Sequence, residues 1–315
     1  MQLKTAIIQQ APIFLNLTES IELAGKLISD SKNNGANIVI FPETWFPGYP
    51  LWFDHAPGAV LWDSKAGKAL FRILYQNSIE VDDINYLTLH KFAKENAVYL
   101  CIGMNEKRAG TIYNTLALID NSGDPYKTKI HRKLVPTFTE RLVWGRGDGS
   151  TLNVMTTEYG NIGGLICWEH WMPLARSHMH DLGEILHISQ WPAAKEMHQI
   201  AARHYAFEGG CFVAAAGTFI MKSDVISGFD SLHTDEHEAG KLLESIEKDV
   251  LMDGGSSLIA PDGAYVINPV HENEKIIYAE FDTDRALEAK YELDTAGHYS
   301  RPDIFQLSVN KKVKF

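Results

Sequence analysis

The sequence predicts an α/β fold made of two similar halves within one domain that spans residues 1–315. Apolar runs with the length of strands alternate with helical patterns along most of the chain. A strand–turn–strand unit occurs twice, as LALIDNSGDPYK and SSLIAPDGAYVI, with Leu-Ile before the turn and a glycine within it. Because no stretch rich in proline and serine separates the halves, we expect a single domain.

The first half begins with elements whose ends the sequence marks clearly. Asn16 is expected to cap a helix, because Glu19 follows three residues later and apolar residues then keep helical spacing up to the sequence NNG. The run NIVIFPE has a continuous apolar centre, as in a strand that is buried on both faces. The other elements expected here are a strand at residues 3–10, a helix at 87–96 and strands at 98–106 and 111–120.

The second half repeats the alternation of strands and helices. We expect strands at 160–167, 184–189, 211–219, 256–260, 264–268 and 275–282, and helices at 173–181, 194–209 and 283–293. Two segments depart from this pattern. Residues 45–77 are rich in aromatic side chains and are expected to form pocket wall and interface, whereas residues 222–255 are polar and are expected to form a long loop with at most one short helix.

Composition excludes several classes of function. The net charge of −11 argues against a nucleic acid or an anionic membrane as the main partner. The longest nearly apolar run, FVAAAGTFIM, has roughly half the length of a membrane-spanning helix. The start, MQLKTAIIQQAP, is a poor signal peptide, and three cysteines do not make a disulfide framework, so we expect a cytoplasmic protein.

One cysteine differs from the other two in its surroundings. Cys101 and Cys211 lie inside apolar strand patterns, where an unreactive core cysteine is expected. Cys167 ends the predicted strand GGLIC and precedes a polar and aromatic cluster, and ligands of open α/β sheets bind at such strand ends. This context leaves two readings open, a core thiol and a nucleophile.

A cysteine nucleophile needs a proton acceptor and a group that stabilises developing charge. His170 is the nearest candidate base, and Glu43, directly after an apolar strand, is another unless it lies on a surface turn. Lys133 and Glu140 flank the rigid turn at Pro136, where a lysine could stabilise an anion, although HRK also fits a solvated charge run. The histidine pair at residues 178 and 180 lacks a third and a fourth ligand at zinc-site spacing, so no metal site is expected. The sequence GRGDGS lacks the other features of a phosphate-binding loop.

Three motifs together resemble one family. The stretches FPETWFPGYP, HRKLVPTFTERLVWGRGDGS and GGLICWEHWMPLAR look like the Glu, Lys and Cys motifs of the nitrilase superfamily of carbon–nitrogen hydrolases, in the same order along the chain. Trp168 and Glu169 after the cysteine, and the stretch HISQWPAAKEMHQIAARHYAFEG, resemble the nitrilase branch. The resemblance implies a four-layer α-β-β-α sandwich with two halves related by a pseudo-twofold axis.

The resemblance also implies a reaction. Cys167 would attack a nitrile with Glu43 as general base, through a thioimidate and then a thioester, to give a carboxylic acid, ammonia and a minor amide by-product. Lys133 would stabilise negative charge, and Glu140 would orient Lys133. An amidase of the same superfamily and a cyanide-hydrolysing branch member are the alternatives within the family. Alternatives of a different class are a metallohydrolase that uses its histidines and a non-catalytic scaffold of the same fold.

The remaining expectations concern binding. The resemblance suggests five pocket-lining residues, each of which could instead pack in the core: Tyr49, Thr137, Trp168, Trp191 and Pro192. The backbone N–H of Trp168 would stabilise charge, and neither Glu169 nor His170 is assigned a chemical step. The implied partners are a small nitrile and water without cofactor, and further copies of the chain in a homodimer or a higher homo-oligomer such as a spiral.

Overall fold

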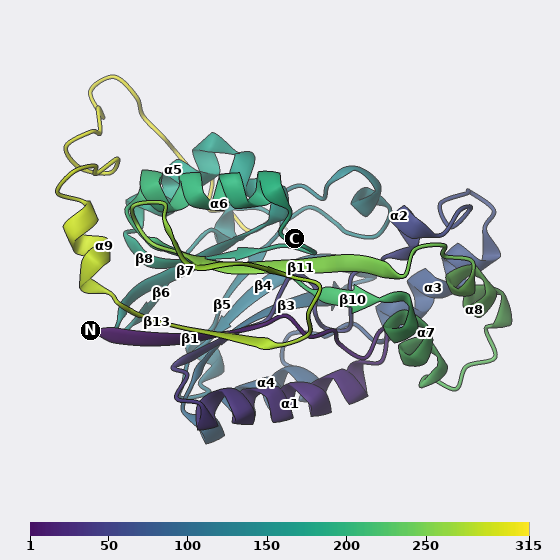
Figure 1. Cartoon of the computed structure of the whole chain (residues 1–315). Helices are drawn as coiled ribbons and strands as arrows, with labels where there is room; N and C mark the ends of the chain where they lie inside the picture. The colour runs from purple at the N-terminus through teal and green to yellow at the C-terminus, as the bar shows by residue number, and fades with distance from the viewer. Residues whose placement is uncertain (315) are drawn as a thin grey trace.

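The computed structural model describes residues 1–314 and has four layers, with two β-sheets between two pairs of helices (Figure 1). One sheet has the strand order β13-β1-β2-β3-β4-β5, and the other has the order β10-β11-β9-β8-β7-β6 with β12 paired to β11. Helices α1 and α4 cover the outer face of the first sheet, and α5 and α6 cover that of the second. This arrangement confirms the expected α-β-β-α sandwich.

The elements have the following bounds. The strands are β1 (Gln2–Ile8), β2 (Ile38–Ile40), β3 (Tyr99–Arg108), β4 (Thr111–Ile119), β5 (Lys129–Arg132), β6 (Met155–Thr157), β7 (Gly160–Ile166), β8 (Glu184–Gln190), β9 (Phe212–Ala216), β10 (Phe219–Met221), β11 (Val250–Ile259), β12 (Tyr265–His271) and β13 (Ile276–Asp282). The helices are α1 (Leu17–Asn33), α2 (Trp52–His55), α3 (Lys65–Gln76), α4 (Ile84–Asn96), α5 (Pro173–Asp181), α6 (Glu196–Gly209), α7 (Lys222–Asp230), α8 (His237–Glu244) and α9 (Asp284–Ala289).

The two sheets repeat one topology, as the duplicated strand–turn–strand unit predicts. In the first, β1, β2 and β3 are parallel, and β4 and β5 continue antiparallel. In the second, β7, β8 and β9 are parallel, and β11 and β12 continue antiparallel. An antiparallel strand flanks the first parallel strand of each set, β13 beside β1 and β6 beside β7.

The alternation of side chains along β1 explains the layering. Leu3 and Ile7 belong to the core that also contains residues of the second sheet, such as Leu165. Ala6 and Ile8 point the other way and belong to the core that the apolar faces of α1 and α4 complete. Because successive side chains of a strand face opposite sides, a continuous apolar run is what a sheet covered on both faces requires.

Several sequence-based boundaries are confirmed and others are wrong. Asn16 caps α1 by accepting a hydrogen bond from the Glu19 N–H at 3.2 Å, as expected. The strand expected at residues 37–43 ends at Ile40, because the chain turns at Pro42 to Thr44. The helix expected at 283–293 is regular only over Asp284–Ala289.

The long loop expected at residues 222–255 is also wrong. This segment contains α7, α8 and the first half of β11, and its helices lie beside α3 at one end of the molecule (Figure 1). Buried apolar residues at helical spacing, among them Val225, Phe229 and Leu243, join α7 and α8 to the core of residues 45–77. In residues 1–314, none of the helices is both long and apolar enough to span a bilayer.

Candidate active site

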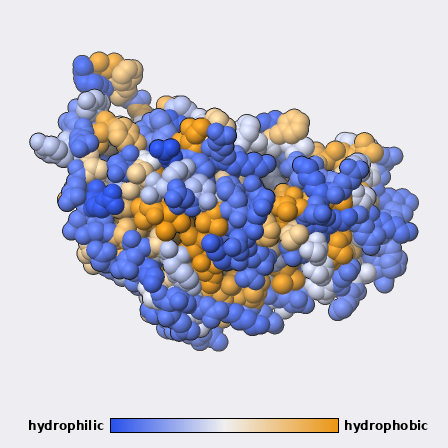
Figure 2. Space-filling view, in the orientation of Figure 1, coloured by the Kyte–Doolittle hydropathy of each residue, from blue (hydrophilic) through white to orange (hydrophobic). Residues whose placement is uncertain are grey.

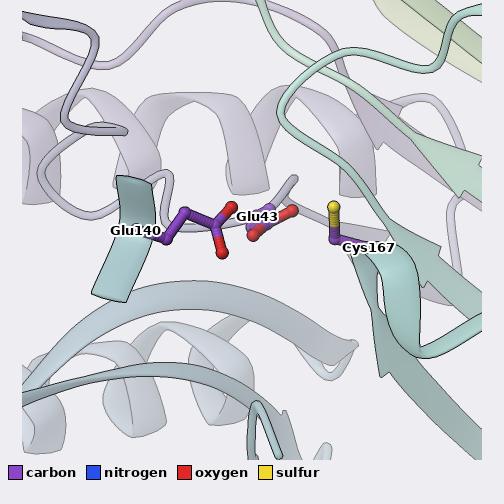
Figure 3. Close-up of side chains that lie close together, drawn as sticks. All are labelled: Glu43, Glu140 and Cys167. Atoms are coloured by element: carbon purple, nitrogen blue, oxygen red, sulfur yellow. The ribbon is translucent and has the colours of Figure 1, made fainter. Parts of the chain in front are cut away.

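Three chain segments bring the expected catalytic side chains together. Glu43 follows β2, Lys133 directly follows β5, and both leave the same edge of the first sheet because β2 and β5 run in the same direction. Cys167 directly follows β7 of the second sheet. Side-chain atoms of Glu43, Glu140 and Cys167 all lie within 4.8 Å of one another (Figure 3).

Cys167 lies where the strand turns into a short 3₁₀ helix, η4 (Cys167–Trp171). Its φ of 53° is in the left-handed region, which a non-glycine residue seldom adopts and which often marks functional sites. The residue is 5% exposed, and burial together with the charge of Glu43 raises the pKa of its thiol well above the usual value. Lys133 and the Trp168 N–H oppose this rise, so the site holds a thiol with preformed support for the thiolate.

The two carboxylate oxygens of Glu43 differ in their hydrogen bonds. Oε1 accepts hydrogen bonds from Asn114 Nδ2 at 2.7 Å and from Lys133 Nζ at 2.8 Å. Oε2 is buried and has no hydrogen-bond partner among the described residues. Burial raises the pKa of Glu43 to about 7 although Lys133 favours the carboxylate, which is the range that suits a general base.

Lys133 is completely buried between the two carboxylates, with Nζ 2.8 Å from Glu43 Oε1 and 2.7 Å from Glu140 Oε2. Burial alone would lower the pKa of this ammonium group, but the negative charges of Cys167, Glu43 and Glu140 outweigh burial and raise it. The positive charge that this acidic cluster needs therefore comes from the chain itself.

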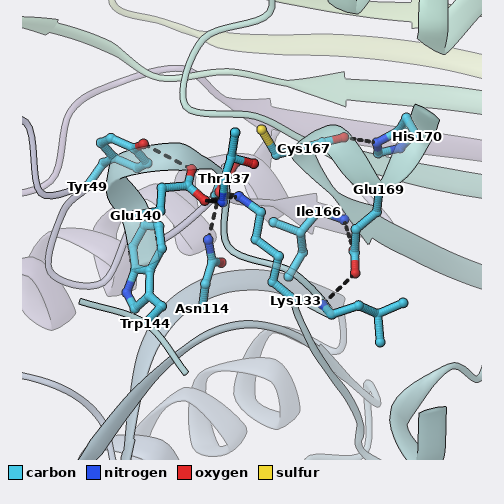
Figure 4. A network of polar contacts seen from close by, with 12 residues as sticks. Tyr49, Asn114, Lys133, Thr137, Glu140, Trp144, Ile166, Cys167, Glu169 and His170 are labelled. Atoms are coloured by element: carbon cyan, nitrogen blue, oxygen red, sulfur yellow. Dashed lines mark hydrogen bonds and ion pairs between the residues drawn. The ribbon is translucent and has the colours of Figure 1, made fainter. Parts of the chain in front are cut away.

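Glu140 is held on both oxygens. Oε1 accepts from the Tyr49 hydroxyl at 3.0 Å, and Oε2 accepts from the Thr137 N–H at 2.6 Å as well as from Lys133 (Figure 4). Because the Tyr49 hydroxyl and the Thr137 N–H hold its carboxylate in place, Glu140 can orient the ammonium group of Lys133.

A cavity of about 630 Å³ opens over this cluster. Tyr49, Thr137, Trp168 and Pro192 line it, as does Cys167, whereas Trp191 does not. The indole of Trp191 is fully buried and stacks on the ring of His198, which is part of the cavity wall. Trp191, which is expected to line the pocket, thus lies behind that wall in this structure and not in it.

Comparison with known proteins shows the family to which this chain belongs. The family model for carbon–nitrogen hydrolase matches residues 4–291. The chain belongs to the carbon–nitrogen hydrolase family. It is 35% identical to an aliphatic nitrilase of Sinorhizobium fredii, over 99% of this chain and 96% of that protein, and 34% identical to nitrilase 2 of Arabidopsis thaliana, over 99% and 89%.

Solved structures confirm the fold. The structure of Nit3 from Saccharomyces cerevisiae, a member of branch 10 of the nitrilase superfamily, superposes with a TM-score of 0.69 at 18% identity and covers 95% of this chain and 97% of that one. A carbon–nitrogen hydrolase from Helicobacter pylori superposes with a TM-score of 0.65. The relatives named nitrilase, together with the family model, show a nitrilase-type carbon–nitrogen hydrolase.

Sequence reasoning missed several residues of the hydrolase site. Asn114, which holds Glu43, lies in the middle of β4, and the signal that it offered was a polar residue inside an apolar strand. Residues 45–77, which were expected to form pocket wall, supply Asp54 and His55 to it, whereas the wall residues Lys248 and Asp253 come from residues 222–255, for which no pocket role was expected.

Glu169 was assigned no chemical step, and the structure shows that it joins the segments of two expected catalytic residues, Cys167 and Lys133. Its carboxylate accepts from the N–H of Ile166 at 2.7 Å (Figure 4) and from the N–H of Leu134 at 2.8 Å. It also lies 2.8 Å from His131 Nε2. Because Ile166 precedes Cys167 and Leu134 follows Lys133, this one side chain connects the Cys and Lys segments of the hydrolase.

Proposed function

We propose that this hydrolase converts an organic nitrile to the carboxylic acid and ammonia, with Cys167 as nucleophile, Glu43 as general base, Lys133 as charge stabiliser and Glu140 as the residue that orients Lys133. One observation carries the proposal: a buried thiol that lines the cavity lies beside a carboxylate that has a free oxygen and a pKa of about 7, and this carboxylate forms an ion pair with a buried ammonium group.

The steps follow from these positions. Glu43 takes the thiol proton as the sulfur of Cys167 attacks the nitrile carbon, and transfer of that proton to nitrogen gives a neutral thioimidate. Lys133 and the Trp168 N–H stabilise the negative charge that builds on nitrogen. Glu43 then takes a proton from an attacking water; the tetrahedral adduct expels ammonia and leaves a thioester, which a second water hydrolyses to the acid and the free thiol. Expulsion of the thiol from the same adduct would release a minor amide.

Two features favour an organic nitrile over the alternatives. The relatives with 33–35% identity over nearly the whole chain are named nitrilases, which favours nitriles over amides. The cavity of about 630 Å³ has the size that accommodates organic molecules and is far larger than cyanide needs. Tyr49, Thr137, Trp168 and Pro192 would contact the organic group.

The test is a panel of aliphatic, arylacetic and aromatic nitriles with the matching amides and cyanide, in which ammonia, acid and amide are measured. We expect ammonia and acid from at least one organic nitrile, none of either from Cys167→Ala, and a covalent adduct on Cys167 by intact-mass spectrometry. Hydrolysis of amides or cyanide but of no organic nitrile would reassign the substrate. Activity that survives Cys167→Ala and is lost with chelators would overturn the mechanism.

We also propose that the enzyme assembles through the layer formed by α5 and α6. Apolar side chains on these helices remain open to solvent in the single chain, with Leu174 69% exposed, Ile200 50% and Phe207 52%. Apolar patches also interrupt the polar surface in Figure 2. Such faces are typical of interfaces between copies of a chain, so a homodimer or a higher homo-oligomer such as a spiral would bury them.

A further inference from the structure

A row of buried polar side chains that the proposed reaction does not use ends at the backbone of Cys167. The Cys167 carbonyl oxygen lies 2.7 Å from His170 Nδ1 (Figure 4), and His170 Nε2 lies 3.0 Å from His187 Nε2. His187 Nδ1 lies 2.9 Å from Glu184 Oε1, and the Tyr205 hydroxyl donates to Glu184 Oε2 at 2.6 Å. All four side chains are at most 2% exposed.

The carbonyl at one end decides where each proton lies. A carbonyl oxygen only accepts, so His170 Nδ1 must carry the proton and a neutral His170 must accept at Nε2. His187 therefore donates from Nε2 and, if neutral, accepts at Nδ1. Among residues 1–314, the group that lies within reach and can donate there is Glu184 in its protonated form, because the other Glu184 oxygen already accepts from Tyr205.

The surroundings favour this neutral arrangement. Burial raises the pKa of Glu184 to about 8, lowers that of His170 to about 3 and lowers that of His187 well below its usual value. Gly163 of β7 makes room for the carboxyl group, since a Cβ there would lie 2.0 Å from Glu184 Oε1. The row is therefore built as a chain of uncharged donors and acceptors.

The peptide bond at the end of this row faces the reacting atoms on its other side. The carbonyl of Cys167 accepts from His170, while the N–H of the same peptide bond, that of Trp168, favours the thiolate form of Cys167. A hydrogen bond to a carbonyl polarises its peptide group and strengthens the N–H as a donor. It also holds the peptide in the orientation that the left-handed φ of Cys167 creates.

We propose that His170, His187 and protonated Glu184 are positioning residues that orient and polarise the Cys167–Trp168 peptide bond, so that its N–H stabilises the negative charge of the transition state. The proposal rests on the proposed function for the identity of that charge. It also explains the place of Trp191, whose indole lies 4.8 Å from the His170 ring and helps to hold it.

The first test is His187→Phe, which keeps a flat ring against Tyr205 but removes the donor to His170. We expect kcat and kcat/KM to fall together by about 10- to 100-fold with little change in KM, because the support acts in the transition state; loss of a whole oxyanion donor costs about 100- to 1000-fold. The matched control is His90→Phe, since His90 is equally buried and bonds a backbone carbonyl at 2.9 Å, but in α4. His90→Phe should lose stability and keep its kcat.

The second test replaces Glu184 by two residues of similar shape, one that can form its hydrogen bonds and one that cannot. In Glu184→Gln the amide can donate to His187 and accept from Tyr205, so activity should stay within about threefold of the wild type, whereas Glu184→Met should fall as His187→Phe does. In infrared spectra at pH 7 the wild type should show the C=O band of a protonated carboxylic acid that Glu184→Gln lacks.

Each of these measurements can contradict the proposed role of the row. Full kcat in folded His187→Phe, or a Glu184→Gln variant as impaired as Glu184→Met, would overturn the proposal. If His187→Phe fails to fold, the Glu184 pair and the infrared band still decide, and absence of the band shows an ion pair instead of the neutral row. Failure of the proposed function is distinguishable, because it appears as an inactive wild type on nitriles while the infrared band remains measurable.

Discussion

Four buried glutamates that lie beside Cys167 or are linked to it by hydrogen bonds differ in the donors that surround them, and this difference determines what each can do. Glu140 and Glu169 are held on both oxygens, and His131 with two backbone N–H groups lowers the pKa of Glu169 against the effect of burial. Glu43 has one free oxygen and a pKa of about 7. Glu184 faces a histidine nitrogen that needs a donor. One residue type thereby supplies two fixed anions, one base and one neutral acid.

The raised pKa of Glu43 predicts the acid limb of the pH profile. The base must be ionised to take the thiol proton, so kcat/KM should fall as the pH drops through about 7. Lys133 keeps its proton across this range because its pKa is raised.

The same raised pKa has the opposite effect on the pH dependence of stability. A glutamate in the unfolded chain ionises near 4.5, so the contribution of Glu43 to stability decreases as the pH rises from about 4.5 to 7. Initial rates on one nitrile from pH 5 to 9 and denaturant unfolding over the same range would measure both.

Asn114→Leu tests whether this limb belongs to Glu43. The Asn114 amide favours the carboxylate, so its loss should raise the pKa and move the acid limb to higher pH. Kinetic profiles of the variant and the wild type in the same buffers make the comparison. An unmoved limb, or one shifted to lower pH, would assign the titration to another group.

The residues that sequence reasoning found stand within local motifs, whereas the role of those that it missed depends on partners far away in the sequence. Glu43, Lys133 and Cys167 each stand at the end of a strand within a distinctive motif, so position and context both mark them. Asn114 was missed because its importance comes from a partner 71 residues away. Trp191 follows a strand in the same way as the catalytic residues, but no local pattern reveals on which side of the wall its indole packs.

At the scale of elements, the turn that carries Glu43 depends on a glycine in a neighbouring strand. A Cβ on Gly103 of β3 would lie 2.0 Å from the Pro42 carbonyl oxygen and 2.6 Å from the Thr44 nitrogen. Both atoms belong to backbone that cannot yield without moving Glu43. The short β2 and its tight turn are thus possible only because β3 has no side chain there.

Gly103→Ala should accordingly damage activity more than stability. Overpacking costs about 1–3 kcal/mol in unfolding free energy, and displacement of Glu43 should lower kcat by at least about 100-fold. Gly240→Ala is the matched control, because a Cβ there would approach only the edge of the Phe229 ring at 3.3 Å, and it should leave kcat unchanged. Denaturant unfolding and steady-state kinetics of both variants would show it. A Gly103→Ala enzyme with normal kcat would mean that the turn can move freely.

Elements with continuous apolar runs or clear caps were predictable, whereas residues 222–255 were not. Helices α7 and α8 are only nine and eight residues long and largely polar. Helix α8 packs against α3, which is distant in sequence, and α7 packs against α8. Since such short helices gain their stability from tertiary packing, their own sequence carries a weak signal.

At the scale of the whole molecule, the duplicated topology places the chemistry between the two halves. The first sheet supplies the segments of Glu43 and Lys133, and the second supplies Cys167. The second sheet also leads directly into η4 and α5, whose apolar residues are exposed. The cavity wall at Trp168, which is 54% exposed, is therefore continuous with the proposed assembly surface.

This continuity predicts that assembly and activity are coupled. Ile200→Asp places a charge in the middle of the α6 face and should shift the oligomer toward monomer, because burying an unpaired charge is costly. Light scattering after gel filtration would measure the mass, and kcat should fall as the dissociated fraction grows on dilution. The matched control is Ile84→Asp, since Ile84 is 75% exposed at the start of α4 on the opposite layer and should change neither mass nor kcat. If Ile200→Asp keeps the wild-type mass while Ile84→Asp dissociates, the enzyme assembles through the α1–α4 layer; if both keep it, neither layer forms the interface.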